Sequence, residues 1–229
     1  GMARDDAREF ASLFHPDYLM GAPPSRTNPE GQPWGYAVFH PAQIASGNAQ
    51  TFLRRRVQRM LSGFDGVRID HPHGMVCPWV YRRDVQPSHV GVRSGARLHE
   101  SQDVAEHSGL ADFAIATADQ LDQSSEPFGE GWVTELTNDQ VEQYSVLINV
   151  VLDCVREAGG DLTSDVACEV LSTLPYPLRR VMEHYGLGRF RVVQKAKLES
   201  PEDVYRIEQA CSNDWIMMGN HDTPPIWML

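Results

Sequence analysis

The sequence predicts an α/β fold in which a parallel sheet forms part of a (β/α)8 barrel. Short segments rich in β-branched and apolar residues alternate with segments whose apolar residues recur at helical spacing, which is typical of βα units. Only four such units follow a long loop near the start, whereas a complete eight-stranded barrel usually takes about 250 residues. We therefore expect residues 2–229 to form one partial barrel domain, and we leave Gly1 out as the scar of a removed tag.

The first half of the chain contains one clear helix and one clear strand. Residues 16–48 are rich in Pro, Gly, Asn and Ser, which predicts a long loop. Residues 48–64 have the apolar stripe of a helix, and residues 66–70 read as a short buried strand. Residues 71–137 show little periodicity. This segment is either a functional excursion over a binding site or a region whose elements the pattern does not reveal.

The second half alternates helices and strands more regularly. Paired glycines at 159–160 and a further glycine at 186 supply helix stop signals. We expect helices at 141–155 and 177–185, a third helix that starts at Ser200-Pro201-Glu202-Asp203, and strands within 161–171, at 189–195 and at 215–219. With the strand at 66–70, these strands should be neighbours in one parallel sheet in sequence order. A ligand site is expected at their carboxyl ends.

Composition and charge narrow the possible partners. The formal net charge of −11 disfavours nucleic acid, whose binding rests on clustered Lys and Arg, and Arg54-Arg55-Arg56 fits a solvated helix face. No apolar run approaches the roughly 18–20 residues of a membrane span, and no secretory signal opens the chain, so we expect a cytoplasmic protein. The four scattered cysteines fit reduced thiols. No nucleotide-binding fingerprint is present, so no cofactor is expected.

Three acidic residues lie at or just beyond predicted strand ends: Asp70, Glu169 and Asp222. Retaining cleavage of a glycosidic bond needs two carboxyl groups roughly 5 to 5.5 Å apart, and acids from two strand ends can meet that requirement. The chain has 31 acidic residues, however, and most acids are solvated surface groups, so their position alone does not identify them as catalytic.

Four segments together resemble the 4-α-glucanotransferase family of the α-amylase clan, also called amylomaltase or disproportionating enzyme. They are Gly66-Val-Arg-Ile-Asp70-His71, Gly21-Ala-Pro-Pro24 with Gly31-Gln-Pro-Trp-Gly35, Cys168-Glu169-Val-Leu171 with Pro175, and Gly219-Asn-His-Asp222-Thr223. Their order and spacing match over about residues 18–227. The resemblance implies that the strands here correspond to strands four to seven of the family's barrel.

The same resemblance implies a site for α-1,4-glucan transfer. It makes Asp70 the nucleophile that forms a covalent glycosyl intermediate, Glu169 the general acid and then base, and Asp222 the group that holds sugar hydroxyls and stabilises the transition state. Arg68 lies on the same strand face as Asp70 and is expected to lower its pKa. The remaining sugar-contacting residues that it implies are His221, Trp34 and His71.

The resemblance has departures, and alternatives remain. Ser25, Val170 and the run Thr223-Pro-Pro225 replace residues usual in the family. Maltooligosaccharides or α-glucans are the expected ligands, with hydrolysis by the same clan mechanism or a non-catalytic glucan-binding fragment as the alternatives. His71, His73 and Cys77 supply too few ligands for a zinc site, so no metal is expected. Because a partial barrel exposes sheet edges and apolar surface, we expect a homo-oligomer.

Overall fold

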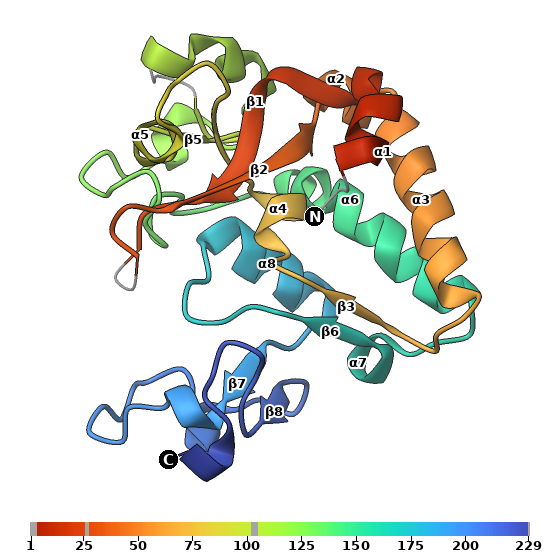
Figure 1. Cartoon of the computed structure of the whole chain (residues 1–229), viewed down its shortest axis with the longest axis vertical. Helices are drawn as coiled ribbons and strands as arrows, with labels where there is room; N and C mark the ends of the chain where they lie inside the picture. The colour runs from red at the N-terminus through yellow and green to blue at the C-terminus, as the bar shows by residue number, and fades with distance from the viewer. Residues whose placement is uncertain (1–3, 26–27, 102–104, 229) are drawn as a thin grey trace.

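The computed structural model describes residues 4–25, 28–101 and 105–228. Parallel strand pairs with helices packed on them make up one part, and an antiparallel sheet makes up another, so the predicted α/β class is confirmed. The antiparallel sheet lies at one end of the molecule and the C-terminal segment at the other (Figure 1). Within the described residues, no helix is both long and apolar enough to cross a membrane.

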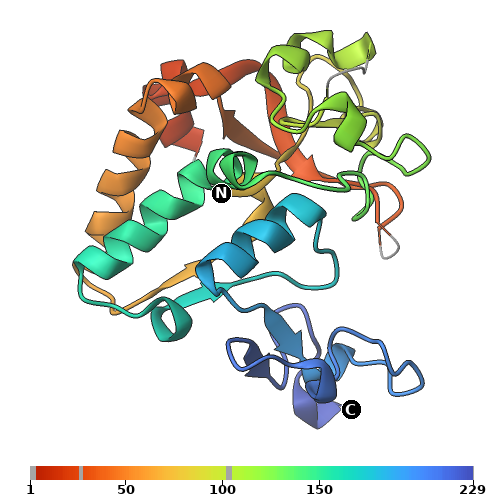
Figure 2. The same ribbon diagram turned by 180° about the vertical axis from the view of Figure 1, so that it is seen from behind.

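The α/β part follows the sequence prediction closely. Its elements are α3 (Asn48–Leu61), β3 (Val67–Ile69), α6 (Asn138–Glu157), β6 (Val166–Cys168), α8 (Tyr176–Tyr185), β7 (Phe190–Val192) and β8 (Trp215–Met217). Strands β3 and β6 pair in parallel, as do β7 and β8. Helices α3 and α6 lie side by side in both views (Figures 1 and 2).

Local signals explain where the two main helices begin and end. Thr137 and Gln140 form a capping box at the start of α6, because each side chain bonds the backbone N–H of the other residue. Helix α8 ends at Gly186, whose φ of 66° lies in the left-handed region that glycine adopts without steric cost. These bonds satisfy backbone groups that a helix end otherwise leaves without partners.

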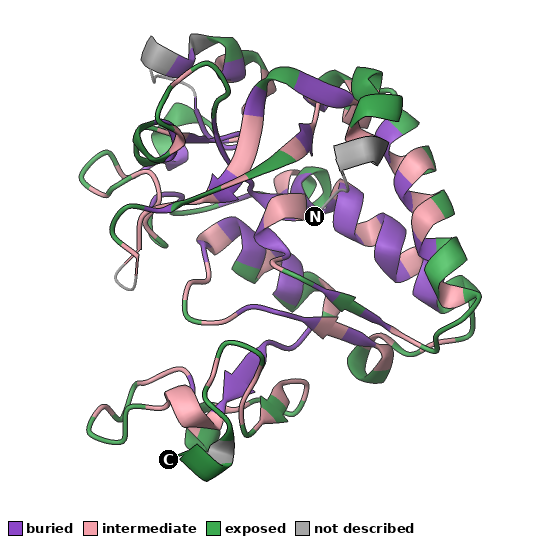
Figure 3. Ribbon diagram, in the orientation of Figure 1, coloured by how far each residue is buried: buried purple, intermediate pink, exposed green. Residues whose placement is uncertain are grey.

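The main core forms around α6. One face of this helix is buried against α3, β3, β6 and α8, with Ile148, Leu152 and Val155 fully buried (Figure 3). Burying a large aliphatic side chain contributes about 1.5–3 kcal/mol relative to leaving it exposed. This core therefore fixes β3 and β6 relative to each other, and with them the residues that follow each strand.

The four parallel strands do not form the single sheet that we predicted. They form two separate pairs, and one backbone hydrogen bond, from Phe190 N to Val170 O at 3.3 Å, links the end of the first pair to the start of the second. The chain bends after β6, so β7 is displaced toward the carboxyl end of β6. The strands follow one another in the predicted order. The prediction that all four are hydrogen-bonded into one continuous sheet is wrong.

The segments predicted as a long loop and as an excursion contain an antiparallel sheet. It has the order β2-β1-β4-β5, built from β1 (Phe14–Ala22), β2 (Gln32–Phe39), β4 (Trp79–Arg82) and β5 (Ala96–Arg97). The prediction of a loop over residues 16–48 is wrong because its Pro and Gly occur where strands tolerate them. Pro33 lies in the edge strand β2, and Pro16 lies where the pairing of β1 with β2 is irregular.

Short helices complete the fold. They are α1 (Arg4–Glu9), α2 (Pro41–Ala45), α4 (His73–Val76), α5 (Ser88–Arg93) and α7 (Leu162–Asp165). The helix predicted from Ser200 does not form, and turns occupy this stretch. The Asp203 carboxylate accepts a hydrogen bond from Tyr205 N, and the Arg191 guanidinium donates to Val204 O, so these backbone groups have non-helical partners.

Candidate functional site

Arg68 connects two of the three predicted acids. Its guanidinium nitrogen Nη2 lies 2.8 Å from Asp70 Oδ1 and 2.6 Å from Glu169 Oε1. Arg68 belongs to β3, Asp70 follows that strand, and Glu169 follows the neighbouring parallel strand β6. The bond from Glu169 N to Ile69 O, 2.9 Å long, continues the ladder and brings the two acids to the same end of the strand pair.

The environments of Asp70 and Glu169 displace their pKa values in opposite directions. A hydrogen bond from Glu169, and then the charge of Arg68, hold the pKa of Asp70 below its usual value. Burial, and then the hydrogen bond to Asp70, raise the pKa of Glu169. The Asp70 side chain is 59% exposed and that of Glu169 only 10%. Asp70 is thus favoured as a carboxylate and Glu169 as a protonated acid.

Asp222 lies beside this pair. It follows β8 on a turn closed by the Asn220 side chain, which accepts from Asp222 N at 3.1 Å. Oxygen or nitrogen atoms of Glu169, His221 and Asp222 all lie within 4.8 Å of one another, and His221 Nε2 is 3.3 Å from Asp222 Oδ1. The three acids predicted from the sequence are therefore brought together, although β8 pairs with β7 and not with the strands that carry the other two.

His71 and Trp34 form the aromatic side of the site. Their rings meet edge to face with centroids 4.6 Å apart, and His71 stacks on His73 at 4.1 Å. His71 has φ of 50°, a left-handed conformation that a non-glycine residue adopts only when its surroundings hold it there. Burial lowers the pKa of His71 to about 4, so this imidazole is neutral at physiological pH.

A cavity of about 220 Å³ lies in front of these residues. Trp34, His71, His73 and Glu169 line it together with the polar residues Asn28, Gln32, Ser172 and Thr173. A second cavity of about 120 Å³ adjoins it and shares His71, His73 and Thr173. A mixture of aromatic surface and hydrogen-bonding groups of this kind suits a sugar ring, which has apolar faces and a hydroxylated rim.

Several residues that line this cavity were not predicted as site residues, among them Gln32 and Thr173. Gln32 stands inside the Gly31-Gln-Pro-Trp-Gly35 segment, so its place in the motif was the available signal. Thr173 lies beyond β6 with no motif of its own. His73 was considered only as a metal ligand.

The geometry bears on metal binding in two ways. His71, His73 and Cys77 do not form a ligand set, because the two rings stack and burial raises the pKa of the Cys77 thiol to about 12. Among the described residues, Glu169, His221 and Asp222 have donor atoms close enough to hold a cation. Arg68 lies against one oxygen of that set and offsets its negative charge, which opposes a cation there.

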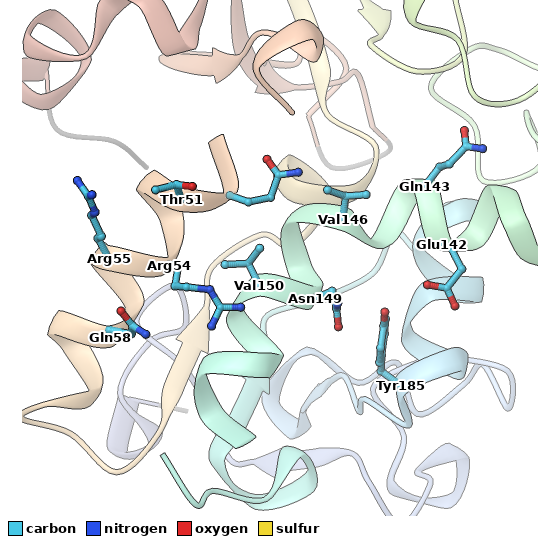
Figure 4. Close-up of a pocket in the computed structure, with 11 residues that line it drawn as sticks. Thr51, Arg54, Arg55, Gln58, Glu142, Gln143, Val146, Asn149, Val150 and Tyr185 are labelled. Carbon is cyan, nitrogen blue, oxygen red and sulfur yellow. The ribbon is translucent and has the colours of Figure 1, made fainter. Parts of the chain in front are cut away.

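A larger cavity, about 750 Å³, lies elsewhere, between α3, α6 and the end of α8. Figure 4 shows the mainly polar side chains around it, among them Arg54, Gln58, Glu142, Asn149 and Tyr185. It contains none of the three acids. Its size alone therefore does not make it the reactive site.

Comparisons with known proteins show to which family the chain belongs. A model of the 4-alpha-glucanotransferase family matches residues 5–228. The 4-alpha-glucanotransferase DPE2 of Oryza sativa subsp. japonica is 27% identical over 136 residues, which are 58% of this chain and 14% of that protein.

Two solved structures have a similar fold. The amylomaltase from Corynebacterium glutamicum gives a TM-score of 0.63 at 18% identity over 96% of this chain and 24% of its own. The amylomaltase from Streptococcus agalactiae in complex with acarbose gives 0.59 at 16% identity over 93% and 34%. The chain thus spans 34% or less of the length of each of the three proteins. Because the family model covers nearly all of its residues, the chain belongs to the 4-alpha-glucanotransferase family.

Proposed function

We propose that this chain carries the reactive acids of a 4-alpha-glucanotransferase, which moves a segment of an α-1,4-glucan from a donor to an acceptor sugar. The observation that carries the proposal is the position of Arg68 between Asp70 and Glu169. The pair combines a carboxyl group whose pKa is lowered with one whose pKa is raised, and retaining glycoside chemistry uses such a pair as nucleophile and acid.

In the first half of the reaction, Asp70 attacks the anomeric carbon of the donor sugar. The glycosidic bond breaks as the new carbon–oxygen bond forms, and Glu169 gives its proton to the leaving oxygen. Arg68 favours this step because its charge keeps the nucleophile ionised. Asp222 lies close enough to Glu169 to hold sugar hydroxyls as positive charge develops on the ring.

In the second half, an acceptor hydroxyl attacks the same carbon and the bond to Asp70 breaks. Glu169, now a carboxylate, accepts the proton of that hydroxyl, so the two residues return to their starting states. Water competes with the acceptor sugar in this step. The ratio of transfer to hydrolysis therefore depends on how well the site binds a second sugar.

The two carboxyl groups share one cationic partner, because Asp70 Oδ1 and Glu169 Oε1 lie 2.8 and 2.6 Å from the same nitrogen, Arg68 Nη2. Asp70 is the more exposed of the two and leaves the pair at the lower desolvation cost. We propose that it swings toward the sugar while Glu169 stays in its buried position.

We also propose that the parallel strands are part of a (β/α)8 barrel within a single domain. Three observations support one curved succession of four strands. Strand β3 pairs in parallel with β6, β7 pairs in parallel with β8, and a backbone hydrogen bond from Phe190 to Val170 connects the two pairs. The three acids follow β3, β6 and β8, and active sites of such barrels lie at the carboxyl ends of the strands.

The test of the function is incubation with maltotriose followed by chromatography of the products. Transfer predicts glucose together with maltodextrins longer than maltotriose. Glucose and maltose without longer products would favour the hydrolase alternative. A folded chain that binds maltotriose without converting it would favour the glucan-binding alternative.

A homo-oligomer is a further proposal, supported by exposed apolar side chains near β8. Ile216, Met218 and Trp227 are 53%, 57% and 83% exposed. Large exposed apolar patches usually mark interaction surfaces. Light scattering on the purified chain tests this, and a stable monomer at micromolar concentration would contradict it.

A further inference from the structure

His73 links the segments that follow β3 and β6. It begins α4, three residues after Asp70, and its side chain is buried with 7% exposure. Its Nε2 lies 2.9 Å from the carbonyl oxygen of Thr173, which is 100 residues away in sequence and four residues beyond Glu169. Because a carbonyl oxygen only accepts, the imidazole Nε2 carries the hydrogen and donates it.

The same ring also supports His71. The two imidazoles stack with their planes 23° apart, and the Trp34 ring also contacts His71. His71 directly follows Asp70 and has the left-handed backbone described above, which is unfavourable for a non-glycine residue unless its surroundings hold it. The position of the Asp70 backbone therefore depends on the stack.

The neutral state of His73 makes this contact independent of ordinary changes in pH. Burial lowers its pKa well below the usual value, and His71, Arg97 and Arg189 lower it further by their charges. The hydrogen bond to the Thr173 carbonyl raises the pKa of His73, but by less than burial lowers it. His73 is therefore an uncharged donor at physiological pH.

We infer that His73 is a positioning residue that holds the Asp70 and Glu169 segments together so that both carboxyl groups meet Arg68. It acts through two contacts: the stack on His71, which fixes the segment after β3, and the bond to Thr173, which fixes the segment after β6. This inference rests on the proposed function for its meaning in catalysis, but the geometry that it describes is testable without turnover.

Two substitutions separate the contacts. His73→Phe keeps an aromatic ring on His71 and removes the donor, which leaves the Thr173 carbonyl without its partner. His73→Gln places an amide N–H near the position of Nε2 and removes the ring. His99→Phe is the matched control, because His99 also bonds a backbone carbonyl, that of Phe113 at 3.2 Å, and is not among the residues that line the reactive cavity.

The first measurement is turnover of maltotriose. For His73→Phe we expect kcat to fall on the order of tenfold to a hundredfold while KM stays within about twofold, because misplaced reacting groups lower the rate of the chemical step. His73→Gln should recover part of kcat, and His99→Phe should keep it. Equal losses in the Phe and Gln variants that follow their losses in Tm would show a merely structural role and overturn the inference.

The second measurement is NMR titration of the Asp70 and Glu169 carboxyl carbons. In the wild-type chain the two pKa values are displaced in opposite directions, and in His73→Phe we expect them to move toward each other. An unchanged separation in a folded His73→Phe variant would overturn the inference, whether or not the chain turns over maltotriose. Absence of wild-type turnover would instead count against the proposed function, and the titration would still decide the role of His73.

Discussion

Glu100 provides a prediction whose size can be worked from the structure. The residue is 2% exposed, and burial raises its pKa from about 4.5 to about 7, although Arg97 and the Tyr144 hydroxyl lower it in part. Between these two pH values the folded chain holds a proton that the unfolded chain has released. The free energy of unfolding therefore falls as pH rises from about 4.5 to 7, and the loss is complete above that range.

The expected loss follows from the displacement of the pKa. At about 1.4 kcal/mol for each pKa unit, Glu100 removes about 3 kcal/mol of stability at pH 8, most of it lost between pH 5 and pH 8. Glu100→Gln removes the ionisation but keeps an oxygen that accepts from Tyr144 Oη, which lies 3.3 Å from Glu100 Oε1. Between pH 5 and pH 8, the free energy of unfolding of the variant should therefore fall by about 2–3 kcal/mol less than that of the wild-type chain.

Urea unfolding followed by circular dichroism at pH 5 and pH 8 measures this difference. Other groups titrate in both proteins and cancel in the comparison. Glu126→Gln removes an exposed acid and serves as the control, with the pH dependence of the wild-type chain expected. If wild type and Glu100→Gln lost the same stability between the two pH values, the reasoning from burial would be refuted.

Three further substitutions test the site and the fold. Arg68→Met should lower kcat on maltotriose on the order of a hundredfold. It should also move the acidic limb of the pH profile of kcat to higher pH, because the pKa of Asp70 rises without the guanidinium. An acidic limb at the wild-type pH would contradict this. Trp34→Ala should raise KM about threefold to tenfold if the indole contacts a sugar, measured by initial rates. Gly188→Ala would place a Cβ 1.6 Å from a backbone oxygen beside β8, so urea unfolding should show a loss of about 1–3 kcal/mol, whereas Gly131→Ala, with open space around it, should not.

The elements that the sequence predicted well are those specified by neighbouring residues. Helix α6 has its apolar face and its capping residues within its own length, and α8 has its terminating glycine directly after it. The strands before Asp70 and Glu169 were recognisable because each is a short apolar run that follows a clear helix. Such signals do not depend on which distant segment the element meets.

The elements that were missed depend on distant partners. Strands β1 and β4 pair antiparallel across about 60 residues, and the Pro and Gly residues near them are also what loops contain. The helix expected from Ser200 had correct local signals, but the Arg191 side chain takes the Val204 carbonyl. Tertiary contacts outweighed local propensity in both places.

In the candidate site, too, local features were predictable from the sequence and contacts between distant residues were not. Strand alternation placed Asp70, Glu169 and Asp222 at strand ends, and the motif resemblance distinguished them from the other acids. The contact of Arg68 with Asp70 was expected from their shared strand face, but the contacts between different strands and segments were not readable in advance. Arg68 bridges two strands, and His73 reaches Thr173 across 100 residues, so both contacts exist only once the chain has folded.

The central claim is that Asp70 forms a covalent bond to the donor sugar while Glu169 moves protons. Maltosyl fluoride is a suitable donor, because fluoride leaves without a proton from Glu169. In a Glu169→Gln variant the first step proceeds but the second lacks its base, so the intermediate should accumulate.

Mass spectrometry of the peptides from Glu169→Gln treated with maltosyl fluoride tests this claim most directly. We predict one added maltosyl group on the peptide that contains Asp70, and none in the double variant that also carries Asp70→Asn. A maltosyl group on a different acidic residue, or an undiminished adduct in the double variant, would contradict the assignment of Asp70 as the nucleophile.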